Sequence, residues 1–376
     1  MYIKKTISSS EIESMLGKVG SDVIELPVGF KKLRIGILPR VAQLIITKLK
    51  KNPEREVKFP HLDLKDNKKI TSILEDPQCL TAILMSNTIS SIDQENFKPK
   101  INKNLIERFE KSPYYRGQRL QLTAVDHSIE KYAFPSFFYS SEEQNQVKSI
   151  SYFKSLIKSF LSEKSKISNL KDQDIDSIAT ILRELIENTE QHGKSDFKTG
   201  KNDKSIRSVI IDYRLINKEL DILSVTGERN RIHNYLLGLQ KKYQTIHLIE
   251  ISVFDSGSGI IKTLSSKYDL RIDNISNQAK EIEKAFTKGV SSKPNGNGYG
   301  RGLDKVKHTL NVRQCYLQIR TDELSLYRDF NRNPLSELEN ASESISFYDE
   351  KTGSDSQYTK LHKVSGLSYS ILVPIK

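Results

Sequence analysis

Tryptophan is absent from this 376-residue sequence, and cysteine occurs only twice. Cys79 and Cys315 lie far apart in the chain and lack the close spacing of a metal-binding pair. A small fold held together by several disulfides is therefore excluded, and a reducing compartment, the cytoplasm, is the expected location. We expect both thiols to be small buried side chains.

Long apolar runs are also missing. No run is long enough to span a bilayer, and the first residues are followed by Ser and Glu instead of the apolar core of a secretory signal. We therefore expect no membrane association. The 36% hydrophobic and 28% charged fractions are ordinary for a globular protein, and the length predicts two domains.

The net charge of +12 is spread along the sequence without a long basic run. Such a charge makes nucleic acid a possible partner but does not select it over other anions. Aromatic residues in 114–140, including Tyr114, Tyr115 and Phe134, lie near Arg116 and Arg119. This pattern fits a stacking platform for nucleic acid or a domain junction packed by aromatic rings.

Residues 1–140 are predicted to form a smaller, mixed α/β domain of unknown role. Apolar spacing predicts a helix over 39–51, a helical segment within 66–90 and a polar loop over 91–104. Short apolar runs predict three strands, at 22–27, 33–38 and 56–59.

The second part of the chain begins with two predicted amphipathic helices, 147–163 and 172–192. The second helix carries Glu184, Asn188 and His192 at a spacing of four residues, which puts all three on one helical face. A solvated polar stripe would show the same spacing, so this motif alone leaves a structural and a binding role open.

A second motif follows an alternating apolar strand, which runs directly into Asp-Ser-Gly-Ser-Gly at residues 255–259. Asp255 therefore lies at the end of a strand. Gly257 and Gly259 let the backbone turn tightly beside it, as is needed where a ligand approaches the main chain.

A third motif is rich in glycine and leads into a predicted helix. Gly296, Gly298, Gly300 and Gly302 alternate with other residues, and Leu303 follows. Backbone N–H groups in such a segment, together with a helix N-terminus, favour phosphate binding. No Gly-Lys-Ser/Thr follows, so the segment is not a Walker A loop, and it lacks the strand–helix setting of a dinucleotide fold.

These three segments, in this order, resemble the N, G1 and G2 boxes of the GHKL superfamily. That superfamily includes gyrase B subunits, ninety-kilodalton heat-shock chaperones, sensor histidine kinases and the mismatch-repair protein MutL. Residues 366–374 resemble the closing G-T-x-F…P strand of the family. The resemblance implies an α+β protein whose C-terminal part, 141–376, is a Bergerat-fold α/β sandwich, a mostly antiparallel sheet backed by helices.

The same resemblance implies ATP and Mg²⁺ as cofactors. Asn188 would be the Mg²⁺ ligand, and Asp255 would accept a hydrogen bond from the adenine amino group beside Gly257 and Gly259. The lid over the phosphates would comprise Gly296, Gly298, Gly300, Gly302 and Leu303, with Lys293 offsetting phosphate charge. Glu184 matches the carboxylate that activates water in hydrolysing members, which favours hydrolysis over simple binding.

Three features depart from the family pattern. Thr189 follows the asparagine where alanine is common, and Leu367 stands where a threonine supports adenine binding, so that Ser368 or a water would have to substitute. Residues 213–246 are interpreted as an insertion. The sequence ends at Lys376 shortly after the closing strand, so we expect no transducer domain to supply a phosphate-contacting lysine.

Three functions remain open at this stage. The first is an ATPase in which lid closure couples the nucleotide state to a protein partner or to self-association. The second is a serine or histidine protein kinase that uses the same pocket, although His127 is the only upstream histidine of interest as a phosphoacceptor. The third is a non-hydrolysing, ATP-gated module that binds nucleic acid or protein.

Overall fold

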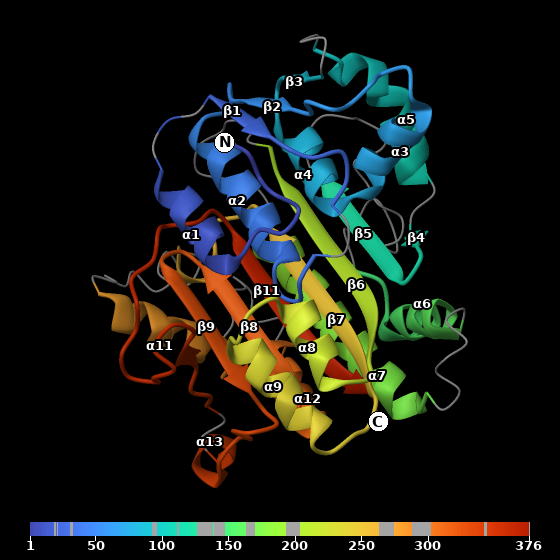
Figure 1. Ribbon diagram of the computed structural model, residues 1–376. Helices are drawn as coiled ribbons and strands as arrows, with labels where there is room; N and C mark the ends of the chain where they lie inside the picture. The colour runs from blue at the N-terminus through green and yellow to red at the C-terminus, as the bar shows by residue number, and fades with distance from the viewer. Residues whose placement is uncertain are drawn as a thin grey trace.

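The structure is a computed structural model (Figure 1). It describes residues 1–18, 20, 22–30, 33–91, 96–110, 113–125, 138, 147–162, 170–192, 204–262, 274–287, 302–341 and 344–375. These residues form a mixed α+β protein built on one large antiparallel sheet, as the sequence predicts at this level of detail. None of the described helices combines the length and apolar character that crossing a bilayer requires.

The large sheet has eight strands in the order β10-β9-β8-β11-β7-β6-β5-β4, and all neighbours are antiparallel. Its long central strands are β6, β7 and β11, which are buried along nearly their whole length because both of their faces are covered. The eight strands are β4 (Tyr114–Arg116), β5 (Arg119–Val125), β6 (Ile206–Ile216), β7 (Ile246–Asp255), β8 (Tyr316–Thr321), β9 (Leu324–Asp329), β10 (Tyr348–Asp349) and β11 (Leu367–Ile375).

Helices cover one face of this sheet in a single hydrophobic cluster, to which Ile178 and Val306 of the helices and Ile251 and Val253 of β7 all contribute. This face will be called the α7 face. Its helices are α6 (Ile150–Ser162), α7 (Asp172–His192), α11 (Ile275–Ala285) and α12 (Gly302–Val312). The predicted helices at 147–163 and 172–192 are thereby confirmed. A short helix, α13 (Glu337–Ala341), follows β9.

Helices also cover the opposite face, which will be called the α2 face (Figure 1). Phe254 of β7 packs there in the cluster of α2, and Leu248 packs in the cluster of α9. The helices are α2 (Leu38–Lys51), α4 (Pro77–Met85), α8 (Glu219–Thr226) and α9 (Arg231–Gln240). The expected insertion at 213–246 thus comprises the end of β6, both α8 and α9, and the start of β7. Its helices cover part of the α2 face, next to α2 and α4.

The remaining N-terminal elements surround a small parallel sheet in the order β1-β2-β3. They are α1 (Ser9–Gly17), β1 (Val23–Glu25), β2 (Glu56–Lys58), α3 (Asn67–Glu75), β3 (Ile89–Ser90) and α5 (Lys98–Glu110). Strands β4 and β5 belong to the large sheet, where β5 pairs along its length with β6. The predicted boundary near residue 140 lies outside the described residues.

Two predictions for this part are wrong. Residues 33–38 form a turn into α2 instead of a strand, because Gly36 adopts a φ of +79° and its N–H donates to the buried carboxylate of Glu250 at 2.8 Å. The predicted loop over 91–104 contains the first turns of α5, which begins at Lys98. Both cysteines are free and buried, as expected.

The described side chains of the aromatic segment contact other side chains of the same protein. Tyr115 stacks on Phe160 with ring centroids 6.2 Å apart, and the guanidinium of Arg108 lies over the Tyr114 ring. Arg119 forms a bidentate pair with Asp212, and Arg116 lies 3.2 Å from a Glu75 oxygen. These contacts favour the domain-junction interpretation for the described residues; Phe134 and His127 lie outside them.

Candidate functional site

The candidate site is built around Asp255, the last residue of β7, whose side chain is only 2% exposed. Because side chains alternate along a strand, Asp255 lies on the same face as Ile251 and Val253, which is the α7 face. Burial raises the pKa of Asp255 to about 6, although the backbone N–H groups of Gly257 and Leu367 donate to the carboxylate and oppose that shift. Above this pKa the carboxyl group is ionised, and it lies where water hardly reaches it.

Gly366 makes this arrangement possible. Its φ is +73°, and a Cβ at this position would lie 2.0 Å from the carbonyl oxygen of Asp255. The missing side chain lets the start of β11 approach the end of β7 closely enough for the Leu367 N–H to reach the carboxylate.

We expect Gly366→Ala to lower the free energy of unfolding by about 2–4 kcal/mol, because it adds backbone strain and a steric overlap. Gly117→Ala is the matched control. Gly117 also has a positive φ, +57°, but a Cβ there would have nothing within 4 Å. Urea denaturation should show a much smaller loss for the control, about 1 kcal/mol. Equal losses in the two variants would contradict the close approach at Gly366.

Helix α2 supports these strand ends from the opposite face. Lys50 Nζ donates to the Ser256 carbonyl at 2.5 Å, and Thr47 Oγ1 accepts from the Ser365 N–H at 2.9 Å. Ser368 Oγ donates to Gln43 of α2 at 3.0 Å. Of the two substitutes expected for the family threonine, Ser368 or a water, Ser368 does not fit, because its hydroxyl lies on the α2 face, away from the Asp255 carboxylate. A water stays the open alternative.

The last turns of α7 are attached to the same region. Glu190 forms a buried ion pair with Arg207 at 2.8 Å, and Arg207 is the register partner of Asp255 in the neighbouring strand. Asn188, two residues before Glu190, has a buried Nδ2 that finds no hydrogen-bond partner among the described residues. Thr189 is satisfied by the carbonyl of Ile186 at 2.9 Å, so this departure from the family pattern leaves no free hydroxyl.

Glu184 lies one turn earlier on α7 and is 7% exposed. A Cβ on Gly302 would lie 2.9 Å from its Oε2, so the start of α12 touches this carboxylate. Its Oε1 accepts from Arg183 at 3.1 Å and from Lys305 of α12 at 3.4 Å. The structure therefore brings the first predicted motif into contact with the last residues of the third, where the positive end of a helix dipole favours anions.

Tyr369 is a residue of this region that sequence reasoning missed. It is 1% exposed and shares the α7 face with Asp255, and within the described ranges its hydroxyl has no hydrogen-bond partner. Burial, with the charge of Asp255 as a smaller cause, raises the pKa of Tyr369. Buried hydroxyls are nearly always paired, so an unpaired one on the same face as Asp255 is consistent with a ligand position. Its signal in the sequence was a tyrosine at the aromatic position of the closing strand.

The other predicted residues divide into two groups. Gly259 has a φ of +81°, and a Cβ there would lie 2.9 Å from Thr321 Oγ1 and from Asp322 Oδ2. Packing therefore leaves no room for a side chain at this position. Gly257 is buried beside Asp255, and Leu303 packs against the core of the α7 face. Four predicted residues lie outside the described part of the chain: Lys293, Gly296, Gly298 and Gly300.

No group of three or more His, Cys, Asp and Glu side chains in the described ranges is arranged to hold a metal ion. A Mg²⁺ site based on Asn188 does not need such a group, because nucleotide-bound Mg²⁺ is completed by phosphate oxygens and water. Comparison of the chain with protein-family models, with curated proteins and with solved structures finds no match.

Proposed function

We propose that this chain is an ATPase of the GHKL type, with the Bergerat fold in its C-terminal part, and that it binds ATP and Mg²⁺ between α7, the end of β7 and the start of α12. One observation carries the proposal most strongly. The buried carboxylate of Asp255 shares the α7 face of the sheet with the Tyr369 hydroxyl, and helix α7, which packs on that face, carries the buried Asn188 Nδ2. In the described part of the chain, neither the hydroxyl nor this amide nitrogen has a hydrogen-bond partner. Such unpaired polar atoms are costly unless a ligand satisfies them.

The roles follow from the chemistry of each group. Asp255 accepts a hydrogen bond from the exocyclic amino group of adenine, and its burial makes that contact selective for a base with a donor at this position. Asn188 offers an amide oxygen to Mg²⁺, which when bound neutralises phosphate charge. Glu184 accepts a proton from, or orients, the attacking water.

One contact favours the second candidate, binding without hydrolysis. Oε1 of Glu184 already accepts hydrogen bonds from Arg183 and Lys305, so this oxygen is occupied by protein donors instead of facing a water molecule. In the described part of the chain, no donor reaches Oε2, which lies beside Gly302. Coupling of a closing lid to a protein partner, self-association and nucleic-acid binding stay predictions from the sequence.

Phosphate release from the purified full-length protein with Mg²⁺ and ATP tests the proposal. Steady release supports an ATPase, whereas tight binding without release supports the gated module. Transfer of labelled phosphate to the chain or to an added protein would identify a kinase. Absence of both binding and turnover would overturn the proposal.

A further inference from the structure

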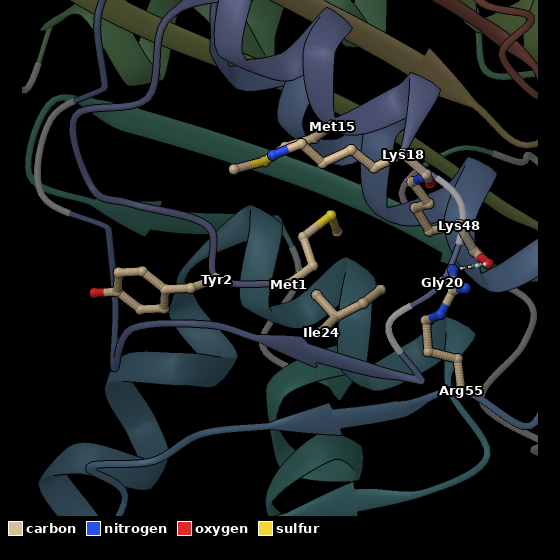
Figure 2. A pocket seen from close by; sticks show the side chains of 8 residues that line it. All are labelled: Met1, Tyr2, Met15, Lys18, Gly20, Ile24, Lys48 and Arg55. Carbon is tan, nitrogen blue, oxygen red and sulfur yellow. Dashed lines mark hydrogen bonds between the residues drawn. The ribbon is translucent and has the colours of Figure 1, made fainter.

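A second site lies in the N-terminal part, on the side of α2 away from the large sheet. A cavity of ≈ 480 Å³ opens between α1, β1 and the C-terminal end of α2 (Figure 2). Its size falls within the range of about 300–1,000 Å³ that is common for small-molecule pockets. None of the residues assigned to the nucleotide site lines it.

The walls of the cavity have two chemical characters. Figure 2 shows Met1, Met15 and Ile24 in its middle, with the cationic side chains grouped together at one end. Lys48 and Arg55 form that end. The arrangement matches a ligand with an apolar body and a single polar head.

Both cations are deeply buried, with 6% of Lys48 and 9% of Arg55 exposed. In the described part of the chain, neither forms an ion pair with a carboxylate. Lys48 Nζ donates to the carbonyls of Leu16 and Lys18 at 3.2 and 2.8 Å, and Arg55 Nη1 donates to the Lys48 carbonyl at 2.9 Å. Arg55 Nε is buried, and no described residue forms a hydrogen bond with it.

Carbonyl oxygens carry only partial negative charge, so they offset the two buried cations incompletely. Burial, the positive charge of Arg55 and that of Lys51 lower the pKa of Lys48, in that order of importance. Two neighbouring buried cations without a carboxylate are costly, and a bound anion removes that cost.

We propose that this cavity is a binding site for a small organic anion, a molecule with one carboxylate or phosphate head and an apolar body. The head is held by Lys48 and Arg55, and the body packs against Met15, Ile24 and the Met1 side chain. Lys18, which is exposed, stands at the rim. The site shares α2 with the nucleotide site, but its ligand binding does not depend on the nucleotide chemistry.

Calorimetric titration of the full-length protein with octanoate, hexyl phosphate, octanamide and inorganic phosphate tests the proposal. We expect one-to-one binding of octanoate or hexyl phosphate. Neutral octanamide should bind at least about tenfold more weakly, because it lacks the charge that the two cations require. Inorganic phosphate should also be weaker than hexyl phosphate, because it leaves the apolar walls unused.

Lys48→Gln should weaken binding of the organic anion at least about tenfold, since a charged hydrogen bond is lost. Lys51→Gln removes the same charge from the exposed side of α2 and should change the affinity less than about twofold, as a screened surface charge does. Met15→Trp is the second variant, which fills the cavity without removing a charge, and it should also abolish binding.

The proposal would be overturned by equal affinity for octanoate and octanamide, by equal loss of affinity in the Lys48 and Lys51 variants, or by no binding of either organic anion. Phosphate binding as tight as that of hexyl phosphate would show an adventitious ion only. Because the titration contains no ATP, its result does not depend on whether the nucleotide site binds ATP.

Discussion

Asp255→Asn is expected to abolish adenine-nucleotide binding and, in the same protein, to increase the stability of the fold at pH 7. The carboxylate is buried, and burial raises its pKa from 3.8 to about 6. An ionised group at pH 7 therefore costs stability, on the order of 1–3 kcal/mol for a shift of this size. The asparagine keeps an oxygen for the Gly257 and Leu367 N–H groups, but it presents no charge to the base.

The pH dependence has a defined sign. A carboxyl with a raised pKa in the folded state binds its proton more tightly there, so its contribution to stability falls as pH rises from about 4 through 6. The free energy of unfolding of the wild type should therefore decrease over this pH range, and that of Asp255→Asn should lack this decrease. Nucleotide affinity of the wild type should fall as pH decreases through about 6, because the protonated carboxyl is a weaker acceptor for the amino group.

Asp212→Asn is the matched control. Asp212 is also buried in the sheet, but it forms a bidentate pair with Arg119 at 2.9 and 3.0 Å. Its substitution should therefore destabilise the fold by about 1–3 kcal/mol and leave nucleotide affinity unchanged. Urea denaturation from pH 4 to 8 and calorimetric titration measure both quantities. A destabilised Asp255→Asn that still binds ATP would show that the carboxylate has only a structural role.

Glu184→Gln is expected to reduce ATP hydrolysis by about 10²- to 10⁴-fold while ATP still binds. The amide keeps the shape of the side chain beside Gly302 but cannot accept a proton from water. Phosphate release under saturating ATP, together with a titration by a non-hydrolysable analogue, separates the two effects.

Glu187→Gln provides the comparison on the same helix. Glu187 pairs with the same Arg183, at 3.1 Å, and its side chain is more exposed than that of Glu184. The Glu187→Gln substitution should change the rate of ATP hydrolysis little. If Glu184→Gln hydrolyses ATP as fast as the wild type, Glu184 has only an orienting role, through Arg183 and Lys305.

The local pattern of apolar residues predicted the helix and the strand that carry the first two motifs. Helix α7 has the predicted bounds because its apolar residues recur at helical spacing after an acidic first turn. Asp255 ends β7 as the alternation before it indicates. The segment 33–38 misled the same reasoning, since its alternating Leu33, Ile35 and Ile37 are buried in a turn where Gly36 is bound by Glu250 of a distant strand.

The contacts that complete the site were beyond such reasoning because they join residues far apart in sequence. Nothing near Lys50 indicates that it reaches Ser256, and nothing near Gly366 indicates that it lies against the Asp255 carbonyl. Tyr369 resembles an ordinary core aromatic until its hydroxyl is found without a partner. Helices α8 and α9, which cover part of the α2 face, were visible in the sequence only as an unexplained insertion.

The most direct measurement is a calorimetric titration of the full-length protein with a non-hydrolysable ATP analogue, with and without Mg²⁺, repeated on Asn188→Ala. We predict one-to-one binding that is strengthened by Mg²⁺ in the wild type. The Asn188 variant should remain folded and lose this Mg²⁺ dependence. An Asn188→Ala protein with undiminished Mg²⁺-dependent affinity, or a wild type that takes up no nucleotide when Mg²⁺ is present, would contradict a shared pocket for Asn188 and Asp255.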